Sequence, residues 1–382
     1  MIIGIDAANL RGGGGVTHLV EVLRAIQPER YGIDRIVIWG GVHSLNLIDD
    51  RPWIDKRSPP TLNGGLIKRT LWQRFRLSAV ARIERCDVLF VPGGSFAGNF
   101  HPVVTMSRNL LPFEMSELLR YGWSLFTLKL LLLRLTQSST FRKVDGVIFL
   151  TKYAENAVLR ITGKLNGKTC IIPHGLNMRF SNSPKQQYAI ANYDAVRPYR
   201  LLYVSVIDYY KHQWNVVEAV ATLRKMGFHI ELHLVGPANP TALQKLNLAL
   251  DIYDAKRCWV HYHGAIPFEE LHKHYAQADI GLFASSCENM PNILLETMAA
   301  GLPVACSNRG PMPEILADTG IFFNPEIPSD ITFALEKLIE SPRLRKSLAM
   351  ASHARSKRFT WQRCADETIG FLSAIAQKQM GK

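Results

Sequence analysis

Short apolar runs recur along the chain and alternate with longer amphipathic stretches. The first series of apolar runs lies at residues 1–6, 36–39, 88–91, 103–106, 146–149 and 170–172. A second series lies at residues 201–206, 230–235, 259–263, 280–284 and from residue 304 onward. Runs this short, bounded by polar and turn residues, predict buried strands. Because helical patterns fill the intervals, the chain is predicted to be α/β, with doubly wound parallel sheets.

The two series of strands suggest two domains. The chain has 382 residues, which is long enough for two complete hydrophobic cores. A polar stretch at residues 186–200 separates the series and is the predicted linker. We therefore expect a first domain over residues 1–190 and a second domain over residues 198–358.

The segment 285–304 carries the most informative chemistry in the chain. It is predicted to run from a loop into a helix that begins near Pro291 and stops at Gly301, before the next strand. Glu288 lies in the loop and Glu296 lies along the helix. The free N–H groups at a helix start favour a phosphate, and carboxylates accept hydrogen bonds from sugar hydroxyls. A nucleotide diphosphate sugar offers both groups, whereas an isolated pair of this kind is more often two ordinary helix-start acids.

The same segment resembles a known family. Glu288 and Glu296 match the Glu-x7-Glu signature of the retaining glycosyltransferases of family 4, and residues 296–304 and 313–315 fit the pattern of that family. The resemblance is strongest over residues 200–320. It implies the GT-B fold, in which two Rossmann-like domains face a cleft and the last helix, here within residues 359–382, crosses back to the first domain.

The resemblance also implies roles for individual residues. Glu288 is expected to hold the hydroxyls of the donor sugar, and Glu296 the ribose. The residues expected to line the donor pocket beside them are Asn289, Met290, Pro291, Ser205 and Gly236. Front-face transfer with retention is the family mechanism, in which the leaving phosphate takes the proton of the acceptor.

One position departs from the family pattern. Relatives carry Gly-Arg-x4-Lys-Gly after the first strand of the second domain, and their Arg and Lys neutralise the leaving diphosphate. Here Lys211 matches the lysine, but Val206 stands at the arginine position. Positive charge is needed where negative charge develops. Lys211 must therefore do more, or Arg108, Arg309 or another base must assist.

A glycine-rich turn follows the first strand. Gly13, Gly14 and Gly15 allow backbone to approach a phosphate closely, and a helix is predicted to start at Thr17. The spacing does not fit a dinucleotide fingerprint, and a flexible loop is the simpler alternative. By resemblance, this loop faces the donor phosphates and the acceptor.

A second loop, 107–113, places Arg108 and Asn109 where many relatives have His-Asp. Either residue is expected to hold a sugar hydroxyl or the acceptor. His174, in the loop 172–177, is interpreted as a structural histidine.

The charge of the chain indicates an anionic partner. The formal net charge is +13, but no nucleic-acid-binding motif is present, so nucleic acid is not an expected partner. Residues 115–143 combine apolar bulk, aromatic residues and bases, which fits a helix at an anionic membrane surface. A buried domain helix fits the same composition equally well.

Other features narrow the location and the chemistry. The N-terminus lacks a signal-peptide pattern, and no apolar run reaches the length of a membrane span, so we expect a cytoplasmic protein with peripheral membrane contact. The six irregularly spaced cysteines indicate reduced thiols. His261, His263, His272 and His274 have no evident acidic partner, so neither a metal site nor a cofactor is expected.

The sequence therefore predicts a retaining glycosyltransferase. It would move a sugar from a nucleotide diphosphate sugar to a glycan or lipid-linked acceptor in surface polysaccharide synthesis, and the resemblance suggests a donor of the GDP-mannose type. A GT-B nucleotide-sugar epimerase is the alternative enzyme. A basic binding protein without catalysis is the alternative outside enzymes, because the family arginine is missing at Val206.

Overall fold

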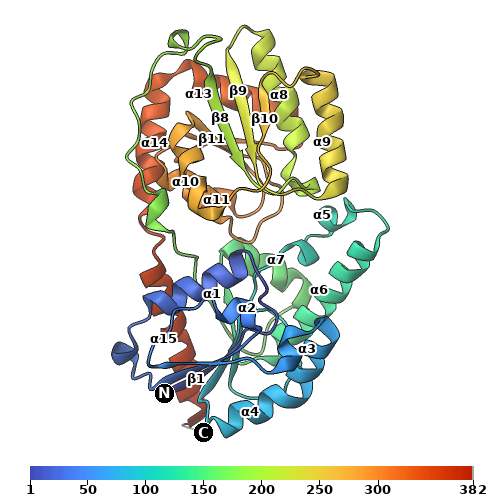
Figure 1. Ribbon diagram of the computed structural model, residues 1–382, viewed down its shortest axis with the longest axis vertical. Coiled ribbons are helices and arrows are strands. Elements are labelled where there is room, and N and C mark those ends of the chain that lie inside the picture. Colours follow the sequence, from blue (N-terminus) through green and yellow to red (C-terminus); the bar gives the residue numbers. More distant parts are fainter. Residues whose placement is uncertain (381–382) are drawn as a thin grey trace. The chain divides into compact units, whose positions relative to one another are not determined.

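The computed structural model describes residues 1–380 and divides into two compact units. The first unit contains Met1–Leu118, Trp123–Gly175 and the C-terminal segment from Phe359. The second unit contains Leu119–Gly122 and Leu176–Arg358. Each unit is a parallel sheet surrounded by helices (Figure 1).

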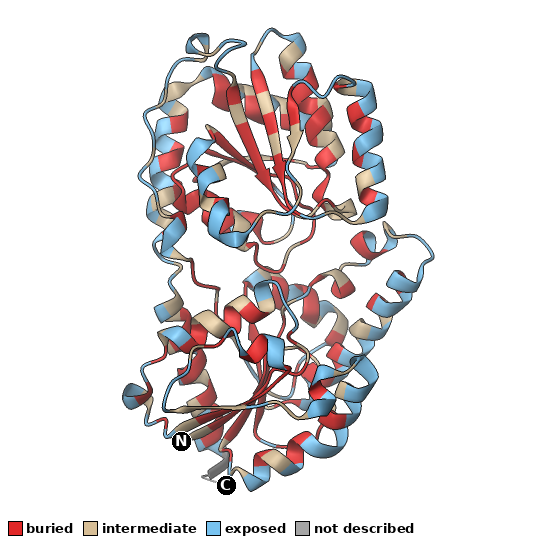
Figure 2. Ribbon diagram, viewed as in Figure 1, coloured by how far each residue is buried: buried red, intermediate tan, exposed pale blue. Residues whose placement is uncertain are grey.

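The first unit contains a seven-stranded parallel sheet. Its strands are β1 (Ile2–Asp6), β2 (Arg35–Trp39), β3 (Ile54–Arg57), β4 (Val88–Val91), β5 (Val103–Met106), β6 (Gly146–Phe149) and β7 (Lys168–Ile171). They lie in the order β3-β2-β1-β4-β5-β6-β7, so the direction of winding reverses between β1 and β4. The inner strands are almost wholly buried (Figure 2), as expected for strands covered on both faces.

Helices cover this first sheet. They are α1 (Gly14–Ala25), α2 (Val42–Leu45), α3 (Leu66–Trp72), α4 (Ser78–Ile83), α5 (Met115–Leu119), α6 (Leu125–Lys143), α7 (Lys152–Thr162) and α15 (Trp361–Met380). The last helix, α15, returns to the first unit and contacts α1 and β4. Among the described residues, no helix is both long enough and apolar enough to cross a bilayer.

The second unit repeats the plan with six parallel strands. They are β8 (Tyr199–Val204), β9 (Ile230–Val235), β10 (Val260–Tyr262), β11 (Ile280–Phe283), β12 (Val304–Ser307) and β13 (Ile321–Phe323). Their order is β10-β9-β8-β11-β12-β13, so winding reverses between β8 and β11. The helices are α8 (Gln213–Lys225), α9 (Pro240–Tyr253), α10 (Phe268–Gln277), α11 (Asn292–Ala299), α12 (Met312–Leu316), α13 (Pro328–Glu340) and α14 (Pro342–Ser356).

The predicted fold class is confirmed, because both sheets are parallel and doubly wound. Two strands, β3 and β13, were not expected from the apolar pattern. β3 has the sequence Ile-Asp-Lys-Arg and lies at a sheet edge, where polar side chains reach water. β13 is only three residues long and also lies at an edge.

Residues 176–190, expected to end the first domain, lie in the second unit. The Phe180 ring is fully buried and packs on Phe268 and Tyr275, with centroids 5.4 and 5.6 Å away. Further along, the fully buried Arg345 donates to the backbone carbonyl of Tyr188 and, over 3.0 Å, to Gln187 Oε1. We had predicted a linker at residues 186–200 from their polar composition. In the structure, side-chain contacts attach this segment to the second unit.

We expect Phe180→Ala to destabilise the second unit by about 3–5 kcal/mol, because it leaves a cavity between two buried rings. Hydrogen exchange in peptides from β8 should become faster, while exchange in β4 of the first unit stays unchanged. Phe333→Ala removes an exposed ring in the same unit and should change neither. Faster exchange confined to β4 would show that this segment supports the first unit instead.

Candidate donor site

Two residues far apart in sequence meet at the reversal point of the second sheet. Lys211 ends a short 3-10 turn, Tyr209–Lys211, that follows β8, and Glu288 lies in the loop after β11. Because β8 and β11 are parallel neighbours, their carboxyl ends share one edge. The Lys211 ammonium forms an ion pair with Glu288 Oε1, and the two side chains are only 5% and 16% exposed.

Aromatic rings and a hydrogen bond fix the lysine. The ammonium lies 5.0 Å from the centroid of the Tyr210 ring and 5.1 Å from that of Phe283, which is the range of cation–π attraction. The Tyr203 hydroxyl donates to the Lys211 carbonyl over 2.8 Å. A buried, charged and oriented lysine of this kind can stabilise an anion that displaces Glu288.

The start of α11 supplies a second group for anions. The helix is capped by Pro291, which has no side-chain acceptor for the N–H groups of the first turn. Asn289, Met290 and Pro291 are buried just before it. The buried Oδ1 of Asn292 has no hydrogen-bond partner within residues 1–380. Sequence reasoning missed Asn292, although an amide in the first turn of this helix is a usable signal.

Glu296 lies one turn further along α11 and is buried. Its Oε2 accepts a hydrogen bond from the Tyr275 hydroxyl over 3.1 Å. Burial raises the pKa of Glu296 to about 7, against the lowering effect of the Tyr275 hydrogen bond. Hydroxyl donors that reach this carboxylate would favour its charged form.

Ser205 and Gly236 have structural contacts in the second unit. The Ser205 hydroxyl accepts a hydrogen bond from Gln213 Nε2 over 2.9 Å. Gly236 has a φ of 145°, and a Cβ there would lie 2.1 Å from the Ser205 carbonyl oxygen. Glycine is therefore required where the ends of β8 and β9 come together. Both residues therefore have a structural role at this edge of the sheet.

Arg309, on the loop beside Glu288, can supply the positive charge that is missing at Val206. Gly310 follows β12 and lies close to the Glu288 backbone, since a Cβ at Gly310 would be 3.8 Å from the Glu288 nitrogen. Arg309 precedes it, is 48% exposed, and lies 3.6 Å from Glu326. A long, half-exposed ion pair of this kind is weak and easily exchanged for a stronger anion.

The glycine-rich turn of the first unit differs from the expectation. Helix α1 begins at Gly14, where we had expected a start at Thr17, and Gly13 caps it with a φ of 61°. Three residues of the turn therefore join the helix, because small residues at positions 14 and 15 pack below Arg108. A Cβ at Gly15 would lie only 2.9 Å from Arg108 Nη1.

Arg108 is a half-buried cation beside this helix start. Its Nε and Nη1 atoms have no hydrogen-bond partner within residues 1–380. Burial lowers the pKa of Arg108 to about 10, so the guanidinium stays charged at neutral pH. A buried charged atom without a partner is costly, so Arg108 and the α1 start together are a candidate anion site in the first unit. Neighbouring Asn109 instead accepts a hydrogen bond from the Leu111 N–H over 3.1 Å and shapes the turn.

Two buried histidines lie next to Arg108. His18 and His174 approach to 2.9 Å between their Nδ1 atoms, and both rings lie near the Trp361 ring. Burial, aided by the Arg108 charge, lowers the pKa of His174 to about 3, so this ring is neutral. These contacts agree with a structural histidine at position 174. Sequence reasoning missed His18, because only the fold brings it to His174.

Comparison with known proteins matches this geometry to a family. Residues 198–341 match the model of the glycosyl transferases group 1 family. This part of the chain is therefore similar to the glycosyl transferases group 1. The matched span contains Lys211, Glu288 and Glu296, so the family assignment rests on the unit that holds the candidate donor site.

Individual relatives are similar to this chain over part of their length. The O-antigen chain mannosyltransferase B of Escherichia coli is 31% identical over 111 residues, which is 29% of this chain and 29% of that protein. The first curated relatives are each matched over half of their length or less.

Solved structures share the whole fold. Sucrose-phosphate synthase from Thermosynechococcus elongatus superposes with a TM-score of 0.76 at 17% identity, covering 96% of this chain and 97% of that one. Anabaena HepE in complex with UDP-glucose has a TM-score of 0.69 at 16% identity and covers 97% of this chain and 99% of its own. These likenesses show that the chain has the GT-B fold.

We expect Glu296→Gln to remove a pH-dependent cost to stability. The pKa of Glu296 rises from its usual 4.5 to about 7 on folding, so the unfolded chain loses this proton first. The free energy of unfolding should therefore fall as pH rises from about 4.5 to 7, by about 3 kcal/mol in total. Glutamine cannot ionise but still accepts from Tyr275, so the variant should lose this fall.

Calorimetric melting of wild type and variant across this pH range measures the difference between them. Glu340→Gln, at an exposed position of the same unit, is the matched control and should follow wild type. An unaltered pH dependence in Glu296→Gln would mean that the carboxylate is already charged in the folded protein.

Proposed function

We propose that this protein is a retaining glycosyltransferase that uses a nucleotide diphosphate sugar. The observation that carries the proposal is the buried Lys211–Glu288 ion pair next to the start of α11. The pair holds a cation for a diphosphate and a carboxylate for sugar hydroxyls at one sheet edge. HepE, which shares this fold, binds UDP-glucose, and this supports a donor of the same chemical class.

Each group has a role in the proposed reaction. The donor diphosphate displaces Glu288 from Lys211, and Glu288 then accepts hydrogen bonds from the sugar hydroxyls. Glu296 accepts from the ribose hydroxyls. The bond from C1 of the sugar to the phosphate oxygen breaks as a bond from C1 to the acceptor oxygen forms on the same face. The proton of the acceptor hydroxyl passes to the leaving diphosphate.

Lys211 has to stabilise the leaving group without the arginine that relatives carry at the position of Val206. We assign Arg309, on the loop beside Glu288, as the supplementary cation within the same unit. Positively charged groups fixed before the reaction reorganise little when charge develops on the phosphate, which makes them effective.

The acceptor is proposed to be a glycan or a lipid-linked saccharide of a surface polysaccharide. The similarity to an O-antigen chain mannosyltransferase supports this class and a hexose donor of the GDP-mannose type. An epimerase would share the donor site but release an altered nucleotide sugar. A binding protein would hold the donor without consuming it.

We expect Glu288→Ala to lower the rate of transfer at least a hundredfold, by analogy with the loss of a preorganised polar group at other reaction centres. A thermal-shift panel of GDP, UDP, ADP and dTDP first identifies the base that stabilises the protein. The reaction is then measured as slow hydrolysis of the corresponding nucleotide sugar, which is monitored through the release of nucleoside diphosphate.

Three variants make the result interpretable. Glu288→Gln removes the negative charge at position 288 but keeps a hydrogen-bond acceptor for Lys211. It therefore tests the effect of the charge on the rate without leaving the lysine unpaired. Lys211→Met should weaken binding of the nucleoside diphosphate, and Glu340→Ala should match wild type. Hydrolysis at the wild-type rate in Glu288→Ala would refute the proposal, an epimerised product would identify the alternative enzyme, and binding without turnover would identify a binding protein.

We also propose that helix α6 meets an anionic membrane surface. Leu125, Leu128, Leu132 and Leu135 recur at helical spacing and are 87%, 54%, 55% and 67% exposed. Trp123 is fully exposed just before them. Lys129 and Arg134 lie on the same helix, and the whole chain carries a net charge of +13. An exposed apolar stripe with aromatic and basic residues suits the boundary between lipid headgroups and acyl chains.

Co-sedimentation with vesicles tests this surface. We expect the wild type to bind vesicles that contain phosphatidylglycerol, and to bind less in high salt, because attraction to anionic lipid is screened. Leu128→Ser combined with Leu132→Ser should lower the bound fraction severalfold. Leu248→Ser, which removes a similarly exposed leucine from α9, should not. Equal binding by both variants would assign the stripe another role.

A further inference from the structure

One face of the second sheet carries a line of histidines next to a glutamate. Along β9, Glu231 and His233 alternate with the buried Ile230, Leu232 and Leu234, so they project from the opposite face. The register pairs His233 with His261 of the neighbouring strand β10. Paired residues of parallel strands share a face, and therefore these three side chains lie together.

Their ligand atoms are spaced like those around a metal ion. Glu231 Oε2 lies 3.4 Å from His233 Nε2, and Glu231 Oε1 lies 3.6 Å from His261 Nε2. One atom from each residue can be chosen so that all three lie within 4.8 Å of one another. A tetrahedral Zn²⁺ with bonds of about 2.0–2.2 Å separates its ligands by about 3.3–3.6 Å. The observed spacing therefore needs little rearrangement.

We propose that Glu231, His233 and His261 bind a divalent transition-metal ion such as Zn²⁺. Two imidazoles and one carboxylate are the donor set that suits Zn²⁺, while Ca²⁺ and Mg²⁺ prefer oxygen ligands alone. Three protein ligands leave the fourth position to water, and the side chains are 19–36% exposed, so an ion can enter from solvent. The sequence argument against a metal overlooked Glu231 and His233.

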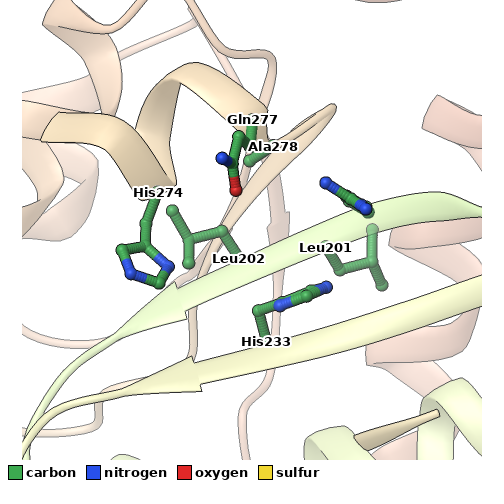
Figure 3. Close-up of a pocket in the computed structure, with 7 residues that line it drawn as sticks. Leu201, Leu202, His233, His274, Gln277 and Ala278 are labelled. Atoms are coloured by element: carbon green, nitrogen blue, oxygen red, sulfur yellow. The ribbon is translucent and has the colours of Figure 1, made fainter. Parts of the chain in front are cut away.

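The histidine ring on β9 already has a second partner that would orient it. His233 Nδ1 lies 3.0 Å from His263 Nε2, and the His263 ring lies 5.0 Å from that of His274 on α10. With the metal on Nε2 of His233, its Nδ1–H donates to His263. Figure 3 shows His233 and His274 lining the same small pocket, with Gln277 and Leu202. Such outer partners fix the ring and raise the basicity of the ligand.

The charges around the site set its affinity. Burial and the neighbouring His261 together lower the pKa of His233 to about 4, against the raising effect of its hydrogen bond to Glu231, so the ring is neutral near pH 7. Arg200 lies 3.8 Å from Glu231 Oε2 and competes with a cation for this carboxylate. Replacing Arg200 should therefore strengthen metal binding, whereas replacing a ligand should weaken it.

A metal ion at this site would link the edge strand β10 to its neighbour β9. Strand β10 has three residues and only β9 as a neighbour, so a bridge between Glu231, His233 and His261 holds it by side chains as well as by the backbone ladder. None of these residues belongs to the candidate donor site. The proposal stands whether or not the protein transfers sugar.

The test uses the full chain without a polyhistidine tag. Competition with a chromophoric chelator measures the affinity for Zn²⁺, and Co²⁺ supplies a visible absorption band that reports four-coordinate geometry. We expect one Zn²⁺ per chain and a melting temperature raised by several degrees in the presence of Zn²⁺. Glu231→Gln and His261→Ala should each lower the affinity at least tenfold, and Arg200→Gln should raise it.

His263→Ala is the variant for the outer partner and should lower the affinity about tenfold without abolishing the cobalt band. His43→Ala removes an exposed histidine from the first unit and should change nothing. Absence of stoichiometric Zn²⁺ binding at micromolar concentration would overturn the proposal. Binding that survives both Glu231→Gln and His261→Ala would overturn it as well, because the ion would then lie elsewhere.

Discussion

Parallel pairing places the carboxyl ends of all strands of a sheet along one edge, and the chemistry of this chain depends on that constraint. In the second unit it brings the loop after β8 to the loop after β11, and Lys211 meets Glu288 there. In the first unit it brings the turn after β1 and the loop after β5 to one edge, and Arg108 lies on Gly15. Both contacts lie at or next to the point where the direction of winding reverses. This is the place at which α/β sheets bind ligands.

The free protein balances its buried charges in different ways in the two units. Lys211 and Glu288 neutralise each other, so the site is stable before a ligand arrives, and a diphosphate has to replace the carboxylate. Within residues 1–380, Nε and Nη1 of Arg108 have no such partner, and an anion bound there would compensate their charge. The first arrangement favours exchange of partners, and the second favours binding of an anion to a prepared cation.

The histidines of β9 and β10 show a different use of the same sheet. The period of two along a strand directs Glu231 and His233 to one face, and parallel register adds His261. This cluster uses the face of the sheet, while the donor site uses its edge. Two separate binding functions can therefore share one unit without competing for residues.

Local sequence patterns predicted the fold class and singled out the segment 285–304 as the candidate donor segment. Apolar runs separated by helical patterns predicted both sheets, and the spacing from Glu288 to Glu296 identified the loop and helix that the structure places at the reversal point. These features are local, because strand burial and helix starts depend on neighbouring residues. The edge strands β3 and β13 were not predicted, because partial exposure weakens the apolar pattern of their sequences.

Long-range packing determines which side chains come into contact. Residues 176–190 pack with the second unit because Phe180 finds Phe268 and Tyr275, which lie far along the chain. His18 reaches His174, and Glu231 reaches His261, through strand order and register that no local pattern encodes. The type of a side chain limits the chemistry that it can perform. Its partners depend on long-range packing, which is determined by the free energy of the whole fold.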